Sequence, residues 1–367
     1  MGNKCIEVPK IGLSLDTNFI LENCYPNPED IVFISGTLIE GIGNACSDID
    51  VYVVTNEYRR SRAIDVRRHH RVISREREII RADDPDQDVY IIHTVVPGTS
   101  IKVDVEFKTF SEANQLFDHV DKIFDYARRN LVLLTKRLTD RDEVFIHRVL
   151  SGRSLQNRKA FTALQKGISR SRYAYVAYRW VASDFAILLD LAGAWQAGEI
   201  DRAAEIAREN IINQTSGYLR LRGVTNLRRK WILTYLRDLD EALLERFLAF
   251  MYMKGVDDAA SKRKYVMQAL DFVDDLFEKS VPFLNSIPDV PSGEAGIELL
   301  HRDQQENCIP SSYSDWEYEY RAKAYGASRN PTRLRLTALG ACEEITRAPA
   351  RRRSRTPGRV GRNATRQ

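Results

Sequence analysis

Two aspartates, Asp48 and Asp50, stand one residue apart in a segment that has the pattern of a β-strand. Side chains two apart on a strand project to the same face, so both carboxylates face away from the apolar residues Ile49, Val51 and Val53. Like charges this close repel each other unless something positive lies between them. A hard divalent cation with oxygen ligands, Mg²⁺ above all, is therefore the ligand that this pair predicts.

A second strand-like segment, residues 101–107, repeats the alternation. Its apolar residues share one face, and the other face carries Lys102, Asp104, Glu106 and Lys108. A carboxylate from this strand beside the first pair would complete a two-metal site. Such a site stabilises both the attacking and the leaving oxygen in phosphoryl transfer.

A Gly-Thr pair, Gly36 and Thr37, follows an apolar strand and precedes a predicted short helix. Backbone N–H groups at a turn that leads into a helix form an anion site. Gly36 lets the backbone approach a phosphate closely, and Thr37 adds a hydroxyl donor. Gly41 and Gly43 keep the following loop compact before the chain returns to the aspartate pair.

The elements that must position these residues follow from the spacing of apolar residues. Strands are predicted at residues 31–35, 47–54, 88–96 and 101–107, and the PGTS sequence between the last two predicts an antiparallel hairpin. Residues 58–81 are crowded with charge and include nine arginines. We expect a helix or a mobile excursion there, and we favour a solvated surface over a role in gripping phosphates.

From Ser111 onward the apolar period changes from two to about 3.6, which predicts helices, with Ser111 as the first N-cap. After Pro282 the pattern is interrupted by Pro, Gly, Ser and Asn. We therefore predict an α/β (α+β) catalytic domain with a mixed or antiparallel sheet, an all-α helical bundle, and a segment of low order that ends in a disordered Arg-rich tail. Their expected bounds are residues 1–130, 131–285 and 286–367.

Charge and cysteine content narrow the class of protein. The formal net charge of +4 is uneven, because residues 347–367 hold eight arginines and no acids, which leaves −4 on the rest of the chain. The five cysteines form no CxxC pair, which argues against a disulfide framework or a zinc site. No apolar run approaches the ~20 residues that span a bilayer, and residues 1–12 lack the apolar core of a secretion signal. We expect a cytoplasmic protein with no membrane association.

The segment ISGTLIEGIGNACSDIDVYVV resembles the signature of the DNA polymerase β-like nucleotidyltransferase superfamily. That signature is a strand, Gly-Ser or Gly-Gly, about ten residues, and Asp-x-Asp on the next strand. Thr37 stands where the family usually has Ser, and it retains the hydroxyl. The family often has its third carboxylate in a Val-Asp-Val context on a later strand. The resemblance assigns that role to Asp104 in VDVEF, with Glu106 in reserve, and covers residues 31–107.

The resemblance also implies roles for individual residues. Asp48, Asp50 and Asp104 would be catalytic and would hold Mg²⁺ or Mn²⁺ against ATP or another NTP, whose phosphates would contact Gly36, Thr37 and Ser47. A weaker likeness to kanamycin nucleotidyltransferase-type enzymes extends into the helical region, where related sequences often contain a Lys-Trp pair. Lys230 would then contact nucleotide phosphates; equally, Lys230 would lie against Trp231 on an amphipathic helix.

These features predict a metal-dependent nucleotidyltransferase that transfers NMP, with AMP from ATP as the expected case, and releases pyrophosphate. A folded body without strong basic charge favours a small molecule or peptide as the acceptor over RNA or a protein side chain. The alternative is a non-catalytic nucleotide-binding regulator, or a toxin–antitoxin component, that retains the fold. The sequence leaves open which NTP is used, what the Arg-rich tail does and the oligomeric state.

Overall fold

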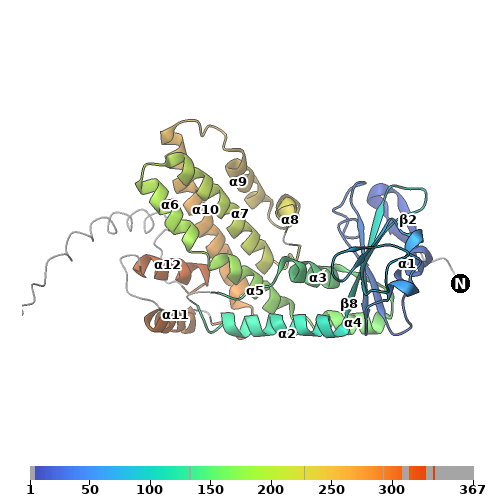
Figure 1. Cartoon of the computed structure of the whole chain (residues 1–367). Coiled ribbons are helices and arrows are strands. Elements are labelled where there is room, and N and C mark those ends of the chain that lie inside the picture. Colours follow the sequence, from blue (N-terminus) through green and yellow to red (C-terminus); the bar gives the residue numbers. More distant parts are fainter. Residues whose placement is uncertain are drawn as a thin grey trace, which may run out of the picture. The chain divides into compact units, whose positions relative to one another are not determined.

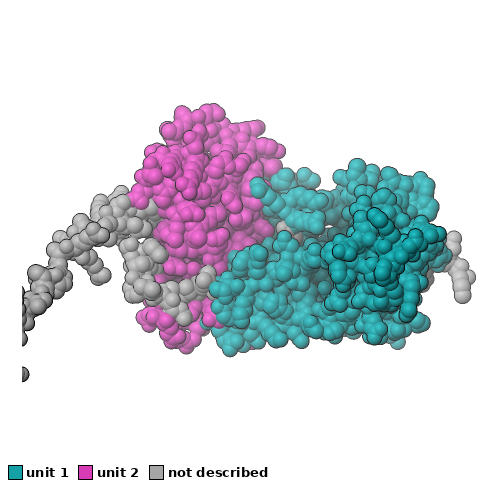
Figure 2. Space-filling view, viewed as in Figure 1, with its two compact units in different colours: residues 1–129, 134–180, 219–244 teal, residues 130–133, 181–218, 245–367 magenta. Residues whose placement is uncertain are grey.

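The computed structural model describes residues 5–131, 134–226, 228–291, 293–307, 314–327 and 334. The chain divides into two compact units (Figure 2). Unit 1 comprises residues 1–129, 134–180 and 219–244, and unit 2 comprises residues 130–133, 181–218 and 245–367. The Arg-rich tail predicted at residues 347–367 lies outside the described residues. No helix in the described ranges combines the length and the apolar character that crossing a membrane requires.

Unit 1 contains a seven-stranded mixed sheet in the order β6-β5-β7-β8-β4-β3-β9, which confirms the predicted α+β class. Strands β4 and β8 are parallel, and all other neighbours in the sheet are antiparallel. The strands are β3 (Ile31–Ser35), β4 (Ile49–Thr55), β5 (Arg71–Ser74), β6 (Ile79–Ile80), β7 (Val89–Val95), β8 (Lys102–Thr109) and β9 (Arg153–Gln156). A separate hairpin consists of β1 (Cys5–Val8) and β2 (Leu13–Asp16).

The four predicted strands correspond to β3, β4, β7 and β8. The predicted hairpin between β7 and β8 is confirmed, because the two strands pair antiparallel from Ile91 to Val95. The turn closes with a hydrogen bond from the Val96 N–H to the Ile101 carbonyl, 2.9 Å. Gly98 has a φ of +71°, a left-handed conformation that glycine adopts without steric cost.

Residues 58–81 do not form the predicted helix or mobile excursion. They contain two 3₁₀ turns, η2 (Ser61–Ala63) and η3 (Val66–Arg68), and then strands β5 and β6 at the sheet edge. The residues of β5 alternate between exposed and buried, with Val72 only 1% exposed, so pairing with β7 outweighs the helix propensity of the arginines. Many of these arginines pair with acids; Arg60, for example, lies 3.0 Å from both Asp86 and Asp88. This pairing agrees with the solvated surface that we favoured for residues 58–81 from the sequence.

The two faces of the sheet are covered by different elements. One face packs against the β1–β2 hairpin and α1 (Thr17–Cys24), and its core includes the fully buried Val51, Val105 and Ile20. The opposite face of the sheet packs against α3 (Asp140–Ser151) and α4 (Arg158–Lys166). There Phe33 of β3 stacks on Phe161 of α4, with 4.8 Å between the ring centroids. Figure 1 shows α1 and α3 on opposite sides of the sheet. The even-numbered residues of β4 therefore point toward α3.

Helix α2 (Phe110–Ala127) begins two residues earlier than the sequence predicted. Thr109, and not Ser111, is the N-cap: its hydroxyl accepts from the Glu112 N–H, and the Glu112 carboxylate accepts from the Thr109 N–H. This reciprocal pair is a capping box, and it joins the last residue of β8 directly to the helix. Unit 1 also holds α5 (Arg170–Ala182, all but its last two residues), a 3₁₀ turn η4 (Arg229–Trp231) and α8 (Ile232–Leu239).

Unit 2 is helical. Its helices, wholly or in most of their residues, are α6 (Ala186–Gln196), α7 (Ile200–Leu221), α9 (Glu241–Tyr252), α10 (Ala259–Asn285), α11 (Gly293–Asn307) and α12 (Ser314–Ala324). A turn at Gly198, with a φ of +76°, separates α6 from α7. Helix α10 continues through Pro282, and α11 and α12 lie where low order was predicted. Buried Trp316 and Tyr320 pack α12 despite the surrounding Ser and Asn residues.

Candidate active site

A row of polar residues crosses five strands of the sheet in unit 1. Ser35 of β3 pairs with Asp50 of β4, Asp50 with Asp104 of β8, Asp104 with His93 of β7, and His93 with Arg71 of β5. Residues that are paired across strands project to the same face. The next row along the same strands contains Phe33, Tyr52 and Ile91 together with Glu106, so it is less polar than the first row. The row combines the two acids with two potential cations.

The structure places two of the three predicted acids, Asp50 and Asp104, next to each other. Asp50 and Asp104 occupy the same register position on parallel neighbouring strands, and their side chains are 19% and 23% exposed. Asp48 lies just before β4 and is exposed. The flanking residues Ile49 and Val103 are fully buried on the other face, as the alternation predicted.

The environment of Asp50 favours its protonated form. Burial raises its pKa to about 7, and the neighbouring charges of Asp48, Asp104 and Glu106 add to the increase. The guanidinium of Arg148 acts in the opposite direction. A carboxyl surrounded by other carboxyls is a position where an additional cation would relieve repulsion. Within the described ranges, however, no three His, Cys, Asp or Glu side chains are already arranged as metal ligands.

Gly36 lies directly against Asp50. It has a φ of +106°, and a Cβ added there would lie 2.5 Å from Asp50 Oδ2. After it, the chain forms a single turn with a hydrogen bond from the Glu40 N–H to the Gly36 carbonyl, 2.9 Å. The short helix predicted after Thr37 is thus replaced by a turn, since Gly41 adopts a left-handed φ of +77° that ends it. The N–H groups of residues 37–39 precede the first hydrogen bond of the turn, as they do at a helix N-terminus.

The other predicted phosphate contacts shape this loop. The Thr37 carbonyl accepts from the N–H groups of Ile42 (3.0 Å) and Gly43 (2.7 Å). A Cβ at Gly43 would approach Thr37 Oγ1 to 2.9 Å, so the compactness that we expected from this glycine is confirmed. Ser47 Oγ accepts from the Asn44 N–H at 3.0 Å and closes the turn before β4. Thr37 and Ser47 are both partly exposed beside the aspartates.

Arg148 of α3, which no sequence motif marks, contacts the site directly. Its Nη2 lies 2.8 Å from Asp50 Oδ2, and its Nη1 lies 3.4 Å from Glu40 Oε1 in the Gly36 turn. His147 Nε2 is 3.0 Å from the same Glu40 oxygen, and His147 Nδ1 is 2.8 Å from Thr225 Oγ1. Two side chains of α3 therefore meet at Glu40, and Thr225 supports His147. Only the tertiary fold places them together, so no local sequence signal could have found them.

The second missed residue is His93, whose Nδ1 lies 2.5 Å from Asp104 Oδ1. Glu106, the reserve candidate for the third acid, lies one step further along β8, in register with Tyr52. Burial raises the pKa of Glu106, and a hydrogen bond from Tyr90 lowers it. The geometry therefore places Asp104, and not Glu106, next to Asp50.

Lys230 lies in the 3₁₀ turn η4, is exposed, and has its Nζ 5.1 Å from the centroid of the Trp231 ring. None of its described contacts reaches the aspartates. The same part of the chain does approach the Gly36 turn, because the pKa of the Tyr235 hydroxyl is raised first by burial and then by the negative charge of Glu40. The segment around Lys230 is thus held near the site by Tyr235 and Thr225.

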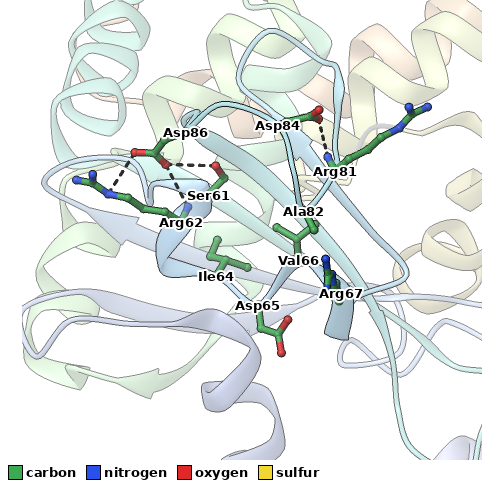
Figure 3. A pocket seen from close by; sticks show the side chains of 10 residues that line it. All are labelled: Ser61, Arg62, Ile64, Asp65, Val66, Arg67, Arg81, Ala82, Asp84 and Asp86. Carbon is green, nitrogen blue, oxygen red and sulfur yellow. Dashed lines mark hydrogen bonds and ion pairs between the residues drawn. The ribbon is translucent and has the colours of Figure 1, made fainter.

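A surface pocket of about 380 Å³ lies in the segment before β7 (Figure 3). Its charged residues are largely engaged: Asp86 accepts from Ser61 and from the Arg62 backbone, and Arg62 Nε lies 3.3 Å from Asp86. Figure 3 shows the Arg81 guanidinium directed away from the other lining residues. None of the pocket's lining residues belongs to the polar row.

A distant likeness to a solved structure is found. No family model matches the chain, and no curated protein matches it. A solved structure of a nucleotidyltransferase-like protein from Exiguobacterium sibiricum 255-15 is similar, with a TM-score of 0.38 and 10% sequence identity over 88% of each chain. Because this TM-score is low, we base the proposed function on the geometry of the site.

Proposed function

We propose that this chain is a metal-dependent nucleotidyltransferase that transfers NMP from an NTP, ATP in the expected case, to an acceptor and releases pyrophosphate. One observation carries the proposal: Asp50 and Asp104 are side by side on parallel strands, and the Gly36 turn lies against Asp50. Two carboxylates beside an anion-binding turn suit a ligand that contains both a divalent cation and phosphates.

The residues present fit a divalent cation by their donor chemistry, since Asp48, Asp50 and Asp104 offer hard carboxylate oxygens. When bound, Mg²⁺ or Mn²⁺ would supply charge neutralisation at the oxygens of the transferring phosphoryl group. Asp50 and Asp48 would hold the nucleotide complex. Asp104 would complete the site and help to take the proton of the acceptor hydroxyl. Gly36, Thr37 and Ser47 would contact the terminal phosphates.

For the acceptor we propose a small molecule or peptide, because six of the nine arginines in the charged segment 58–81 are paired with acids and do not form a free basic surface for RNA. Lys230 has no assigned role in this proposal, since its described contact is with Trp231. A requirement for RNA would appear as acceptor binding that weakens steeply with added salt.

The proposal is tested by pyrophosphate release from each NTP with Mg²⁺ or Mn²⁺, in the presence of pools of metabolites, peptides and RNA. Wild type should release pyrophosphate with one pool, and Asp50→Asn should not. Asp118→Asn is the matched control, because Asp118 is an exposed aspartate on α2 and should leave release unchanged. Equal release by wild type and Asp50→Asn would refute the proposed role of the site.

A second candidate function is a non-catalytic nucleotide-binding regulator, or a toxin–antitoxin component. It is favoured by one observation: both acids already have a basic partner, Arg148 for Asp50 and His93 for Asp104. A site whose acids already contact basic side chains of the same chain depends less on a cation for stability. Nucleotide binding that is independent of Mg²⁺, with no pyrophosphate release from any pool, would support this candidate.

A further inference from the structure

The hydrogen-bonding groups of Arg148 are only partly used. Nη2 contacts Asp50 at 2.8 Å and Nη1 contacts Glu40 at 3.4 Å, while Nε has no hydrogen-bond partner among the described residues. The side chain is buried, with 10% of its surface exposed. A buried polar group without a partner is unusual and suggests that a ligand completes the arrangement.

The two edges of the Arg148 guanidinium are held differently. Glu40, which holds Nη1, is itself fixed by His147, and His147 is fixed in turn by Thr225. The opposite edge consists of Nε and Nη2, and Asp50 is its single partner among the residues that the structure describes. This edge carries two parallel N–H donors, the arrangement that binds two oxygens of a carboxylate or phosphate at once.

We propose that Arg148 binds a phosphate group of the nucleotide, and that Asp50 holds it in place until the nucleotide arrives. The inference rests on the proposed function. When Asp50 binds a divalent cation, it no longer pairs with Arg148. The Nε–Nη2 edge of Arg148 can then bind two phosphate oxygens. Nη1 stays on Glu40 throughout, so the guanidinium keeps its position and changes one anionic partner for another.

Charge balance gives this exchange a measurable consequence. Without nucleotide, a cation at Asp50 would leave the buried Arg148 short of an anion, which is costly in a protein interior. With nucleotide, both the carboxylate and the guanidinium have partners of opposite charge. The cation and the nucleotide are therefore expected to bind cooperatively, with Arg148 as the residue that couples them.

The test compares binding of Mn²⁺ alone with binding of Mn²⁺–α,β-methylene-ATP by the full chain. Relative to wild type, Arg148→Gln should bind Mn²⁺ alone about tenfold more tightly, because Asp50 is released from its ion pair. The same variant should bind the Mn²⁺–nucleotide complex about tenfold more weakly, because a charge-assisted bidentate contact is lost. A purely structural role for Arg148 would weaken both.

Arg148→Lys provides the second variant, in case the glutamine variant does not fold. It keeps the charge beside Asp50 but has no paired donor edge, so Mn²⁺ alone should bind as in wild type while the complex binds more weakly. Equal effects on both ligands in both variants would overturn the role of Arg148 and leave the proposed function standing. A wild-type chain that binds no Mn²⁺–nucleotide complex would overturn both proposals.

Discussion

Asp50 and Asp104 are direct neighbours on the only parallel strand pair of the described sheet, although 54 residues separate them in the chain. Parallel pairing puts both carboxylates at the same level and on the same face. Gly36 and Arg148 close around Asp50 from the preceding turn and from α3. A cation site and a phosphate site would thus share one carboxylate, Asp50.

Replacement of Gly36 by alanine should disrupt the site. The added Cβ would lie 2.5 Å from Asp50 Oδ2 in a backbone with a φ of +106°, so we expect a loss of about 1–3 kcal/mol in unfolding free energy. Nucleotide binding should also be lost. Gly98→Ala is the control, because Gly98 has a positive φ but nothing within 4 Å of its added Cβ. It should cost about 1 kcal/mol and leave binding intact. Chemical unfolding and a nucleotide titration measure both, and equal effects of the two variants would contradict the role of Gly36.

His93 should matter through Asp104, which it contacts at 2.5 Å. A partner that orients a ligating carboxylate typically changes metal affinity by about 10–100-fold when it is removed. We therefore expect His93→Ala to weaken Mn²⁺–nucleotide binding by about tenfold, and His93→Asn, which retains an N–H donor, to weaken it less. His70→Ala changes an exposed histidine of the same unit and serves as the control. If His93→Ala binds like His70→Ala, Asp104 needs no such support.

The raised pKa of Asp50 predicts how stability changes with pH. Its pKa is about 7 in the folded chain and close to 3.8 when unfolded, so the folded state holds its proton more firmly. The resulting stabilisation is complete below pH 3.8 and is lost as the pH rises toward 7, by up to about 1.4 kcal/mol per pH unit. Urea unfolding of wild type and Asp50→Asn in EDTA measures the difference between them. Wild type should lose stability relative to the variant across this window, and a constant difference would contradict the raised pKa.

Much of the sheet could be predicted from the sequence, because each strand carries a local signal. Apolar runs and apolar alternation place β3, β4, β7 and β8, and alternation sets which face of β4 and β8 carries the acids. The prediction from local propensity was wrong at residues 58–81, where a helix or a mobile excursion was expected. Long-range pairing with β7 instead produces strand β5 in this arginine-rich segment. The prediction was also wrong after Gly36, where a single turn stands in place of the expected short helix.

The start of α2 shows a smaller error of the same kind, and it gives a direct test. Ser111 fits the sequence rule for an N-cap, but β8 runs to Thr109, and Thr109 makes the capping box with Glu112. Thr109→Ala should therefore lower the unfolding free energy by about 1 kcal/mol. Ser111→Ala should have an effect close to zero, since its hydroxyl only accepts from Gln115 on the helix surface. The reverse order of the two effects would restore the original prediction.

The partners of the acids could not be predicted at all. Arg148 is one of many arginines in the sequence, and nothing in α3 marks it as different from the exposed Arg141 on the same helix. Its significance arises because α3 packs on the face of the sheet that carries Asp50. His93 likewise depends on the register of β7 against β8. Sequence motifs thus identify the acids, and only the fold identifies Arg148 and His93 as the residues that contact them.

The central claim is most directly tested by following labelled phosphorus from ATP into the acceptor fraction. Nucleotidyl transfer moves the α-phosphorus to the acceptor and releases the β- and γ-phosphorus as pyrophosphate. We predict that α-³²P label enters the acceptor with wild type and that it does not with Asp50→Asn or Asp104→Asn, while γ-³²P label never does. Transfer of the γ-label, or transfer of the α-label that persists in both aspartate variants, would contradict the assignment of this site.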